Sequence, residues 1–347
     1  MATVKATELV HLTHDGNFQL DAEGRVVLCR VVDDDNAVLE EGEKNATNDN
    51  DGRGTTVTLS LEIILDVTTM HPRGGGQPSD VGTVTGIRGC GGGGIVATIS
   101  DVTIDKSTGV VVHRGVVILT RREEALASGP HTETPPFPPG STVFVRVDPD
   151  RRLLNSECHT AGHVVDAAMA RIDASSGMIP LKGYHFQDGP YVEYGGGNID
   201  ARERDAFLDG LRAAFQVSAE RESLHAVFVA IVLLPRKSRF LNRDACFEQN
   251  GKELVGEDMP TVIRTLPTDE AMALCGDRLA KNFDFSGKGG RDDNAEGEVR
   301  VVTVAGWHAP CGGTHVRSTG ELRDRGWYVR GLKCKKGSVR VRYGPAE

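Results

Sequence analysis

Residues 155–171 read NSECHTAGHVVDAAMAR and contain the most informative pattern of the chain. Asn155 or Ser156 can cap a helix that continues to the end of this segment. His159 and His163 are four residues apart, so a helix places both imidazoles on one face. Neutral imidazole is a usual zinc ligand, and two rings on one face can bind one ion. The segment therefore predicts a helix that carries half of a metal site.

The spacing of these histidines also has other interpretations. Zinc proteases use the same spacing, but they need a glutamate directly after the first histidine as a base. Thr160 occupies that position, which argues against a protease. For the helical pair alone, two histidines with unrelated hydrogen bonds are the simpler interpretation.

A second metal-binding pattern, Cys311-Gly-Gly-Thr-His315, lies near the C-terminal end. Gly312 and Gly313 permit a tight backbone path on which thiolate and imidazole turn toward one ion. With the helical histidines they form a Cys-His₃ set, which suits zinc. Four protein ligands are typical of structural zinc, whereas catalytic zinc keeps one position open. Catalysis therefore requires either one weak ligand or an expanded coordination shell; His308 is a spare candidate that is more simply a surface histidine.

Composition restricts the class of protein. The 347 residues suffice for two domains, and 39% hydrophobic with 26% charged residues describe a globular chain. No apolar run approaches the roughly 18 residues of a membrane span, and the polar N-terminal stretch argues against export. Seven irregularly spaced cysteines suit a reducing compartment better than a disulfide framework. These observations predict a soluble, cytoplasmic protein.

The first part of the chain reads as strands and loops. Alternating or clustered β-branched residues predict strands at 26–32, 56–65, 95–99, 110–119 and 143–147. Residues 33–54 are too acidic to pack and predict a surface insertion, and 89–94 predict a glycine-rich loop. Five prolines within 129–140 indicate a linker. We therefore expect two domains, at 1–148 and 149–347.

The second part mixes helices with strands. Segments 184–186 and 191–194 predict a hairpin, and 200–215 and 268–276 predict helices. Further strands are expected at 224–234, 299–304, 327–333 and 339–343, with a polar loop at 286–298. This order favours an α+β class, with helices on one face of a mostly antiparallel sheet.

Charge is distributed unevenly. The net charge of −9 argues against a general nucleic-acid binder, yet residues 317–342 hold nine basic and two acidic residues. A solvated basic face of a strand pair is the simpler interpretation. If the protein binds nucleic acid, Trp327 and Tyr328 would stack there, although such aromatics are more often core. The expected phosphate contacts are Arg317, Arg323, Arg325, Arg330, Lys333, Lys335 and Lys336.

Residues 74–84, GGGQPSDVGTV, form a third pattern. Its glycines permit close backbone approach to another surface, and Gln77 can both donate and accept hydrogen bonds. Taken alone, it is a glycine turn.

Together the motifs resemble the alanyl-tRNA synthetase editing domain and its AlaX relatives, in the superfamily of the threonyl and alanyl tRNA synthetase second additional domain. The segments that carry the resemblance are GGGQPSDVGTV at 74–84, HTAGHVVDAAM at 159–169, KGYHF at 182–186, VEY at 192–194 and CGGTHVRSTGEL at 311–322. The resemblance implies a β-barrel-like N-terminal domain and an α/β editing domain. It implies Zn²⁺ held by His159, His163, Cys311 and His315, with Gln77 over the site.

The resemblance also implies hydrolysis of serine or glycine wrongly esterified to the tRNA for alanine. The chain lacks a recognisable adenylation motif, so we expect a freestanding enzyme that edits mischarged tRNA in trans. Gly312 and Gly313 amides are candidates for stabilising the oxyanion, and Thr160 and Gln77 for recognising the serine hydroxyl. Two alternatives stay open: a non-catalytic, zinc-stabilised tRNA-binding module, and a deacylase for a threonine-class mischarged tRNA.

Overall fold

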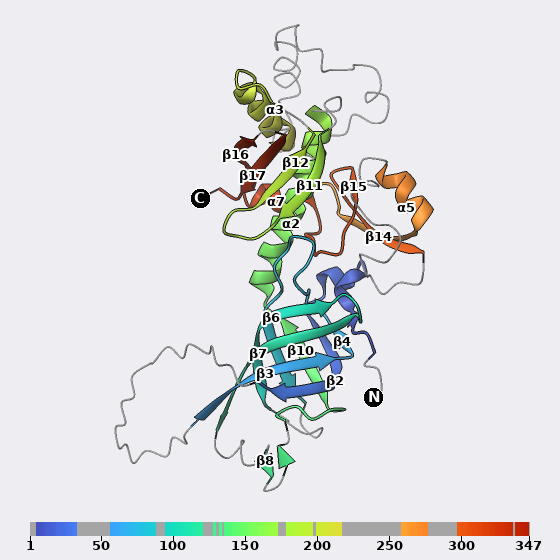
Figure 1. Ribbon diagram of the computed structural model, residues 1–347, viewed down its shortest axis with the longest axis vertical. Helices are drawn as coiled ribbons and strands as arrows, with labels where there is room; N and C mark the ends of the chain where they lie inside the picture. Colours follow the sequence, from blue (N-terminus) through green and yellow to red (C-terminus); the bar gives the residue numbers. More distant parts are fainter. Residues whose placement is uncertain are drawn as a thin grey trace, which may run out of the picture. The chain divides into compact units, whose positions relative to one another are not determined.

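The chain divides into two compact units in the computed structural model (Figure 1). The barrel unit comprises Met1–Val10, Gln19–Arg73 and Ser79–Pro149, and the second unit comprises His11–Phe18, Gly74–Pro78 and Asp150–Glu347. The structure describes residues 5–32, 56–87, 94–120, 128–129, 132–133, 135–172, 178–196, 199–216, 258–276, 297–335 and 337–346.

Six antiparallel strands close the barrel in the order β10, β2, β3, β7, β6, β5. Their bounds are Thr142–Val147 (β10), Asp21–Val31 (β2), Thr56–Leu65 (β3), Val110–Thr120 (β7), Val96–Asp105 (β6) and Gly82–Gly86 (β5). Beside them, β1 (Glu8–Leu9) pairs in parallel with β4 (Val67–Thr68), and β8 (Ser128–Gly129) pairs with β9 (Thr132–Glu133).

Alternation along the strands fills the barrel. Leu61, Ile63 and Leu65 are almost fully buried at every second position of β3. The residues between them face outward, as the period of two in a strand requires. β3 pairs with β7 from Thr56↔Thr120 to Ile64↔Val112, which fixes which residues of β7 point inward.

The second unit is built around one long helix and a four-stranded antiparallel sheet. Helix α2 spans Pro149–Ile172, and the sheet has the order β11, β12, β17, β16. These strands span Ile179–Tyr184 (β11), Tyr191–Gly195 (β12), Ser338–Gly344 (β17) and Tyr328–Lys335 (β16). Helix α3, Arg204–Gln216, lies against β16 (Figure 1).

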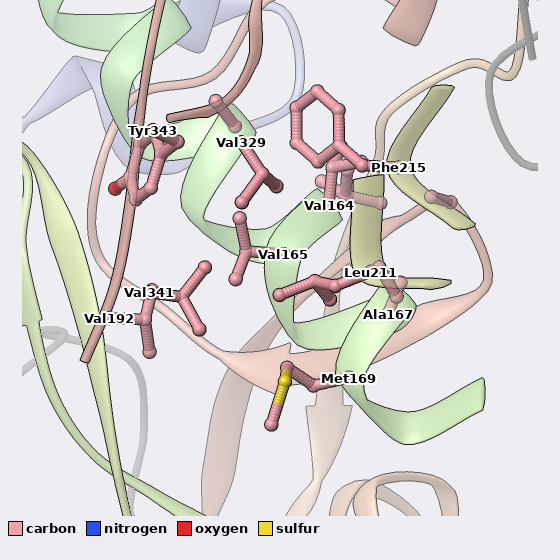
Figure 2. Packing of buried hydrophobic residues seen from close by; sticks show 14 of the residues in the cluster. Val164, Val165, Ala167, Met169, Val192, Leu211, Phe215, Val329, Val341 and Tyr343 are labelled. Carbon is pink, nitrogen blue, oxygen red and sulfur yellow. The ribbon is translucent and has the colours of Figure 1, made fainter. Parts of the chain in front are cut away.

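One face of the sheet and two helices enclose the core of this unit. Figure 2 shows Val165 of α2 directed toward Val341 of β17, whereas Val164 of α2 is directed toward Leu211 and Phe215 of α3. All five side chains are buried and belong to the same hydrophobic cluster. Burying such a side chain contributes about 1.5–3 kcal/mol, so this contact holds α2 in place.

A smaller sheet leads to the second metal-binding pattern. It comprises β13 (Val262–Pro267), β14 (Glu298–Val304) and β15 (Trp307–Pro310), in that order and all antiparallel. Helix α5 (Thr268–Cys275) packs against it, and helix α7 (Thr319–Asp324) follows. Two short 3₁₀ turns, Val10–Leu12 and Gly16–Phe18, also occur near the start of the chain.

The structure confirms the expected α+β class with its barrel and antiparallel sheets. It corrects the start of the long helix: Asn155 and Ser156 lie inside α2, not at its cap, because Pro149 supplies a preset φ at the first position. The predicted strand at 224–234 and the insertion at 33–54 fall outside the described residues, as do 89–93 and most of 286–298. Among the described helices, none is both long and apolar enough to cross a membrane.

A buried histidine makes the barrel sensitive to acid. His113 of β7 is fully buried and bonds through Nε2 to Thr68 Oγ1 at 2.9 Å and through Nδ1 to the Ile63 carbonyl at 3.1 Å. Burial lowers the pKa of His113 to about 4. In the unfolded chain His113 therefore binds a proton below about pH 6.5, whereas in the folded barrel it binds a proton only below about pH 4. His113 thus contributes stability above pH 6.5, and that contribution is lost as the pH falls toward 4.

We expect the opening free energy of β3 and β7 to fall by about 2 kcal/mol more in the wild type than in His113→Gln between pH 7.5 and 5.0. Glutamine keeps a donor and an acceptor for the two partners but does not titrate. Hydrogen exchange of peptides from these strands, corrected for intrinsic exchange rates, measures the difference. Equal losses in the two proteins would contradict the assignment.

Candidate metal centre

Four side chains of the second unit converge on one point. They are His159, His163, Cys311 and His315, and the nitrogen or sulfur atom that each offers lies within 4.8 Å of the other three. Helix α2 carries the first two, and the loop after β15 carries the others. The two patterns that sequence spacing could not connect are therefore brought together, and the group could hold a metal ion.

The distances in the group suit a tetrahedral ion. Cys311 Sγ lies 3.3 Å from His159 Nε2 and 3.4 Å from His315 Nε2. Sulfur and nitrogen ligands of one tetrahedral zinc would be about 3.6 Å apart, given zinc–ligand distances of about 2.0–2.3 Å. His163 Nε2 is buried and has no hydrogen-bond partner among the described residues. A buried nitrogen without a partner is costly unless it binds something, so the residues present fit a metal.

Gln77 fixes the orientation of His159. Its Oε1 accepts a hydrogen bond from the backbone N–H of Thr314 at 3.1 Å, and its Nε2 donates to Thr314 Oγ1 at 2.9 Å. A backbone N–H can only donate, so the atom facing it is the oxygen. The same oxygen lies 2.7 Å from His159 Nδ1, which must therefore carry the proton. This leaves Nε2 of His159 with its lone pair directed into the group.

The other two histidines have equivalent partners. Nδ1 of His163 lies 3.6 Å from Asp166 Oδ2, and Asp166 also accepts a hydrogen bond from the Tyr194 hydroxyl at 2.5 Å. Nδ1 of His315 lies 3.2 Å from Thr160 Oγ1. Metal-binding histidines commonly donate their second ring nitrogen to such a partner. All three imidazoles are thus arranged to offer Nε2.

Buried polar contacts hold the loop that carries Cys311 and His315. The Asn17 side chain accepts from the backbone N–H of His315 at 3.0 Å and donates to its carbonyl at 2.8 Å. Arg300 of β14 is 1% exposed, and its guanidinium donates to the carbonyls of Cys311 and Leu12. These contacts fix the backbone from which both donor side chains project.

Electrostatics favour the ligand form of the thiol. Burial alone would raise the pKa of Cys311, but the His315 and His163 imidazoles hold it well below its usual range. Burial lowers the pKa of His315 to about 3, despite the attraction of the thiolate. Burial also works against a charge on His163, but Asp166 and Cys311 raise its pKa to about 10. The group therefore combines a thiolate with a demand for positive charge, which a divalent cation would supply.

His185 belongs to this environment, although sequence reasoning gave it no role. Its ring stacks on His159 with centroids 4.4 Å apart, and its Nδ1 lies 2.6 Å from the Tyr343 hydroxyl. A Cβ at Gly162 or Gly183 would come within 2.5 Å of the His185 ring. The glycines therefore leave space for this ring. The pairing of Asp166 with His163 was also missed, although their i, i+3 spacing on a helix is a readable signal.

The expected non-metal residues of the site have different positions. Gln77 and Thr160 are fully buried, with polar atoms bonded to His159 and His315, so both act on ligand side chains. Gly312 is exposed. Gly313 is buried, and its N–H points at Cys311 Sγ, 3.4 Å away.

The expected nucleic-acid residues are spread over several contacts. Arg317 lies over the Phe18 ring at 4.2 Å, and Arg325 pairs with Glu157 at 3.2 Å. Lys333 and Lys335 are exposed on β16, whereas Trp327 is buried, so it cannot stack on a bound base. Of the remaining three, Arg323 pairs with Asp324, Arg330 donates to the Pro345 carbonyl, and Lys336 lies outside the described residues.

The geometry thus defines a class: an α+β protein with a Cys-His₃ group able to hold a metal ion. The sequence profile of the threonyl and alanyl tRNA synthetase second additional domain matches residues 299–324, which include Cys311 and His315. The comparison supports the assignment of the second metal-binding pattern to this superfamily.

Similar proteins cover most of the chain. An alanine–tRNA ligase of Desulfosudis oleivorans is 27% identical over 268 residues, 77% of this chain and 22% of the ligase. The alanyl-tRNA editing protein Aarsd1 of Rattus norvegicus is 24% identical over 276 residues, 79% of this chain and 47% of that protein. The chain thus spans about a fifth of the ligase and about half of Aarsd1. These comparisons confirm the resemblance to the alanyl-tRNA editing family.

Gly313 offers a test of the packing around the group. A Cβ there would lie 2.2 Å from two atoms of the His159 ring and 2.7 Å from Gln77 Oε1. Overpacking of this kind typically costs about 1–3 kcal/mol. We expect Gly313→Ala to bind a divalent metal ion, tested with Zn²⁺, about 10- to 100-fold more weakly, because His159 and Gln77 must separate.

Competition with a chromophoric chelator measures this zinc affinity. Gly210→Ala in α3 is the matched control, since a Cβ there meets nothing within 4 Å. It should leave the affinity unchanged. Wild-type affinity in Gly313→Ala would show that the packing does not control the group.

Proposed function

We propose that the protein is a zinc-dependent aminoacyl-tRNA deacylase that removes serine or glycine from wrongly charged tRNA for alanine. The convergence of His159, His163, Cys311 and His315 carries the proposal, because this donor set suits zinc. Its similarity to a protein named as an alanyl-tRNA editing protein supports the substrate class. We assign the chemistry to the second unit, which comprises Asp150–Glu347 together with His11–Phe18 and Gly74–Pro78.

In this proposal the four donor residues would hold zinc, which would supply Lewis acidity at the site. Gln77, Thr160 and Asp166 are positioning residues, because each lies at the Nδ1 atom of an imidazole and so directs Nε2 toward the other donors. The backbone N–H of Gly312, which is an exposed residue, is a candidate to stabilise the oxyanion. We assign Gly313 a supporting role, since its N–H already faces Cys311 Sγ.

The reaction is hydrolysis of one ester bond. Water adds to the carbonyl carbon of the amino acid, and the bond from this carbon to the terminal ribose oxygen breaks. The ribose oxygen takes up a proton, and the products are the free amino acid and uncharged tRNA. No redox partner or nucleotide is required, so the donor group and a positioned water suffice.

The four-donor set also favours a second candidate. Structural zinc sites are closed by four protein ligands, and a closed site would make this chain a zinc-stabilised tRNA-binding module. Cys311 and His163 are only partly buried, whereas His159 and His315 are buried. The partial exposure of Cys311 supports deacylation, because deacylation requires access for water and the ester.

The deciding experiment measures deacylation with and without a chelator. The substrates are the tRNA for alanine charged with serine, glycine, alanine or threonine, and the tRNA for threonine charged with serine. We expect zinc-dependent release of serine or glycine from the alanine tRNA, and slow release of alanine. Binding without release from any substrate would favour the binding module. Release only from seryl-tRNA for threonine would favour the threonine-class deacylase.

His163→Ala tests the donor assignment. We expect loss of zinc binding and a fall in kcat of at least about 100-fold, because only three donors remain and the lost group also pairs with Asp166. His308→Ala is the matched control, since His308 bonds to Thr303 and lies outside the group of four. A His163→Ala protein with full zinc content and full activity would remove His163 from the site.

A further inference from the structure

Three aromatic rings form a continuous stack on the second unit. Tyr184 stacks on Phe186 with centroids 4.7 Å apart and on Tyr191 with centroids 5.3 Å apart, at interplanar angles of 16° and 20°. All three side chains are partly exposed. We call Phe186, Tyr184 and Tyr191 the aromatic row. It lies at the hairpin that joins β11 to β12, on the side of the sheet opposite the buried core.

One end of the aromatic row is covered and the other is open. The guanidinium of Arg340 lies 4.8 Å from the centre of the Tyr191 ring. Among the described residues, no further ring stacks beyond Phe186. A flat aromatic group can therefore extend the row at Phe186. A nucleotide base has this shape, and every base offers a π face.

Strand register surrounds the row with basic side chains. Lys182 lies opposite Glu193, Glu193 opposite Arg340, and Arg340 opposite Lys333. Residues directly opposite each other in antiparallel strands project from the same face. Tyr191 lies opposite Arg342 in the same way. The resulting basic flank consists of the exposed residues Lys182, Lys333, Lys335 and Arg342.

The acidic groups of this face are engaged locally. Glu193 accepts a hydrogen bond from Arg340 at 2.6 Å, and Asp188 accepts from the Tyr184 hydroxyl at 3.0 Å. The basic flank therefore leaves a positive surface beside the row, although the chain as a whole carries −9. A protein with this net charge attracts nucleic acid only where basic side chains are concentrated.

The row is one backbone layer away from the candidate metal centre. His185 lies between Tyr184 and Phe186 in sequence and projects inward, where its ring stacks on His159 at 4.4 Å. A nucleotide at Phe186 would thus lie near the donor group without entering it.

We propose that the aromatic row and the basic flank bind unpaired nucleotides, with a base stacked on Phe186 and phosphates at Lys182 and Arg342. The identification of these nucleotides as the acceptor end of tRNA rests on the proposed function. The stacking surface itself acts on single-stranded RNA whether or not an ester is hydrolysed.

Fluorescence anisotropy of the full chain with a labelled eight-nucleotide single-stranded RNA tests the proposal. Phe186→Ala should weaken binding about tenfold, whereas Phe186→Tyr should stay within about twofold of the wild type, because it keeps the ring. Arg342→Ala should weaken binding and lower the salt dependence of log K by about 0.7, the loss of one phosphate contact. Lys106 is an exposed lysine of the barrel unit, and Lys106→Ala should change neither the affinity nor its salt dependence.

Several results would overturn the surface. One is wild-type affinity in both Phe186→Ala and Arg342→Ala. Another is a loss of affinity in Lys106→Ala as large as in these two variants. A third is an affinity for double-stranded RNA equal to that for single-stranded RNA, which would indicate binding by charge alone. Thermal melting identifies a Phe186→Ala protein that fails to fold, and Arg342→Ala then decides. Deacylation is measured separately: Phe186→Ala should raise KM and leave kcat nearly unchanged. If no ester is hydrolysed but Phe186→Ala still weakens RNA binding, the surface stands and the proposed function fails.

Discussion

Every property of the candidate metal centre depends on which nitrogen each imidazole presents. A histidine ring that turns over offers a proton where a lone pair is required, so donor residues at the right positions are not sufficient. Here the carbonyl oxygen of Gln77, the hydroxyl of Thr160 and the carboxylate of Asp166 each face an Nδ1 atom. The Thr314 backbone holds Gln77 in place, and Asn17 holds the backbone of His315. The centre is therefore an extended hydrogen-bonded structure, of which the four donors are only the inner part.

The packing of α2 supplies the rigidity that this arrangement needs. The same helix that carries His159 and His163 buries Val165 against the sheet and Val164 against α3 (Figure 2). A change in the helix position of even a fraction of an ångström would alter both donor positions together. The glycines at 162, 183 and 313 have no room for a side chain, so the rings and the loop are already in close contact. Core packing and site geometry are thus one constraint in this unit.

The sequence predicted several strands well, because strand signals are local, whereas the convergence of the four donors was expected from the family resemblance and not from their spacing. β3 has the predicted bounds, Thr56–Leu65, and the four donors lie together as expected. The start of α2 was predicted wrongly because Asn155 and Ser156 are residue types that often cap helices. The helix instead begins at Pro149, shortly after β10 ends at Val147. His185 and Asn17 could not be predicted, since their roles arise from contacts between residues far apart in sequence. Which atom of the Gln77 amide accepts and which donates likewise depends on the Thr314 backbone N–H beside it, a contact between residues far apart in sequence.

The stretches His11–Phe18 and Gly74–Pro78 belong to the second unit although they are encoded among the first 148 residues. A fragment that starts at residue 149 would retain every donor but lack the Gln77 amide and the Asn17 brace. The gene therefore does not encode this centre as one contiguous module. Recombination that transplants only the C-terminal portion would transfer the donors without the groups that hold their protons in place. Inheritance of both portions together is the simplest way for such a centre to persist.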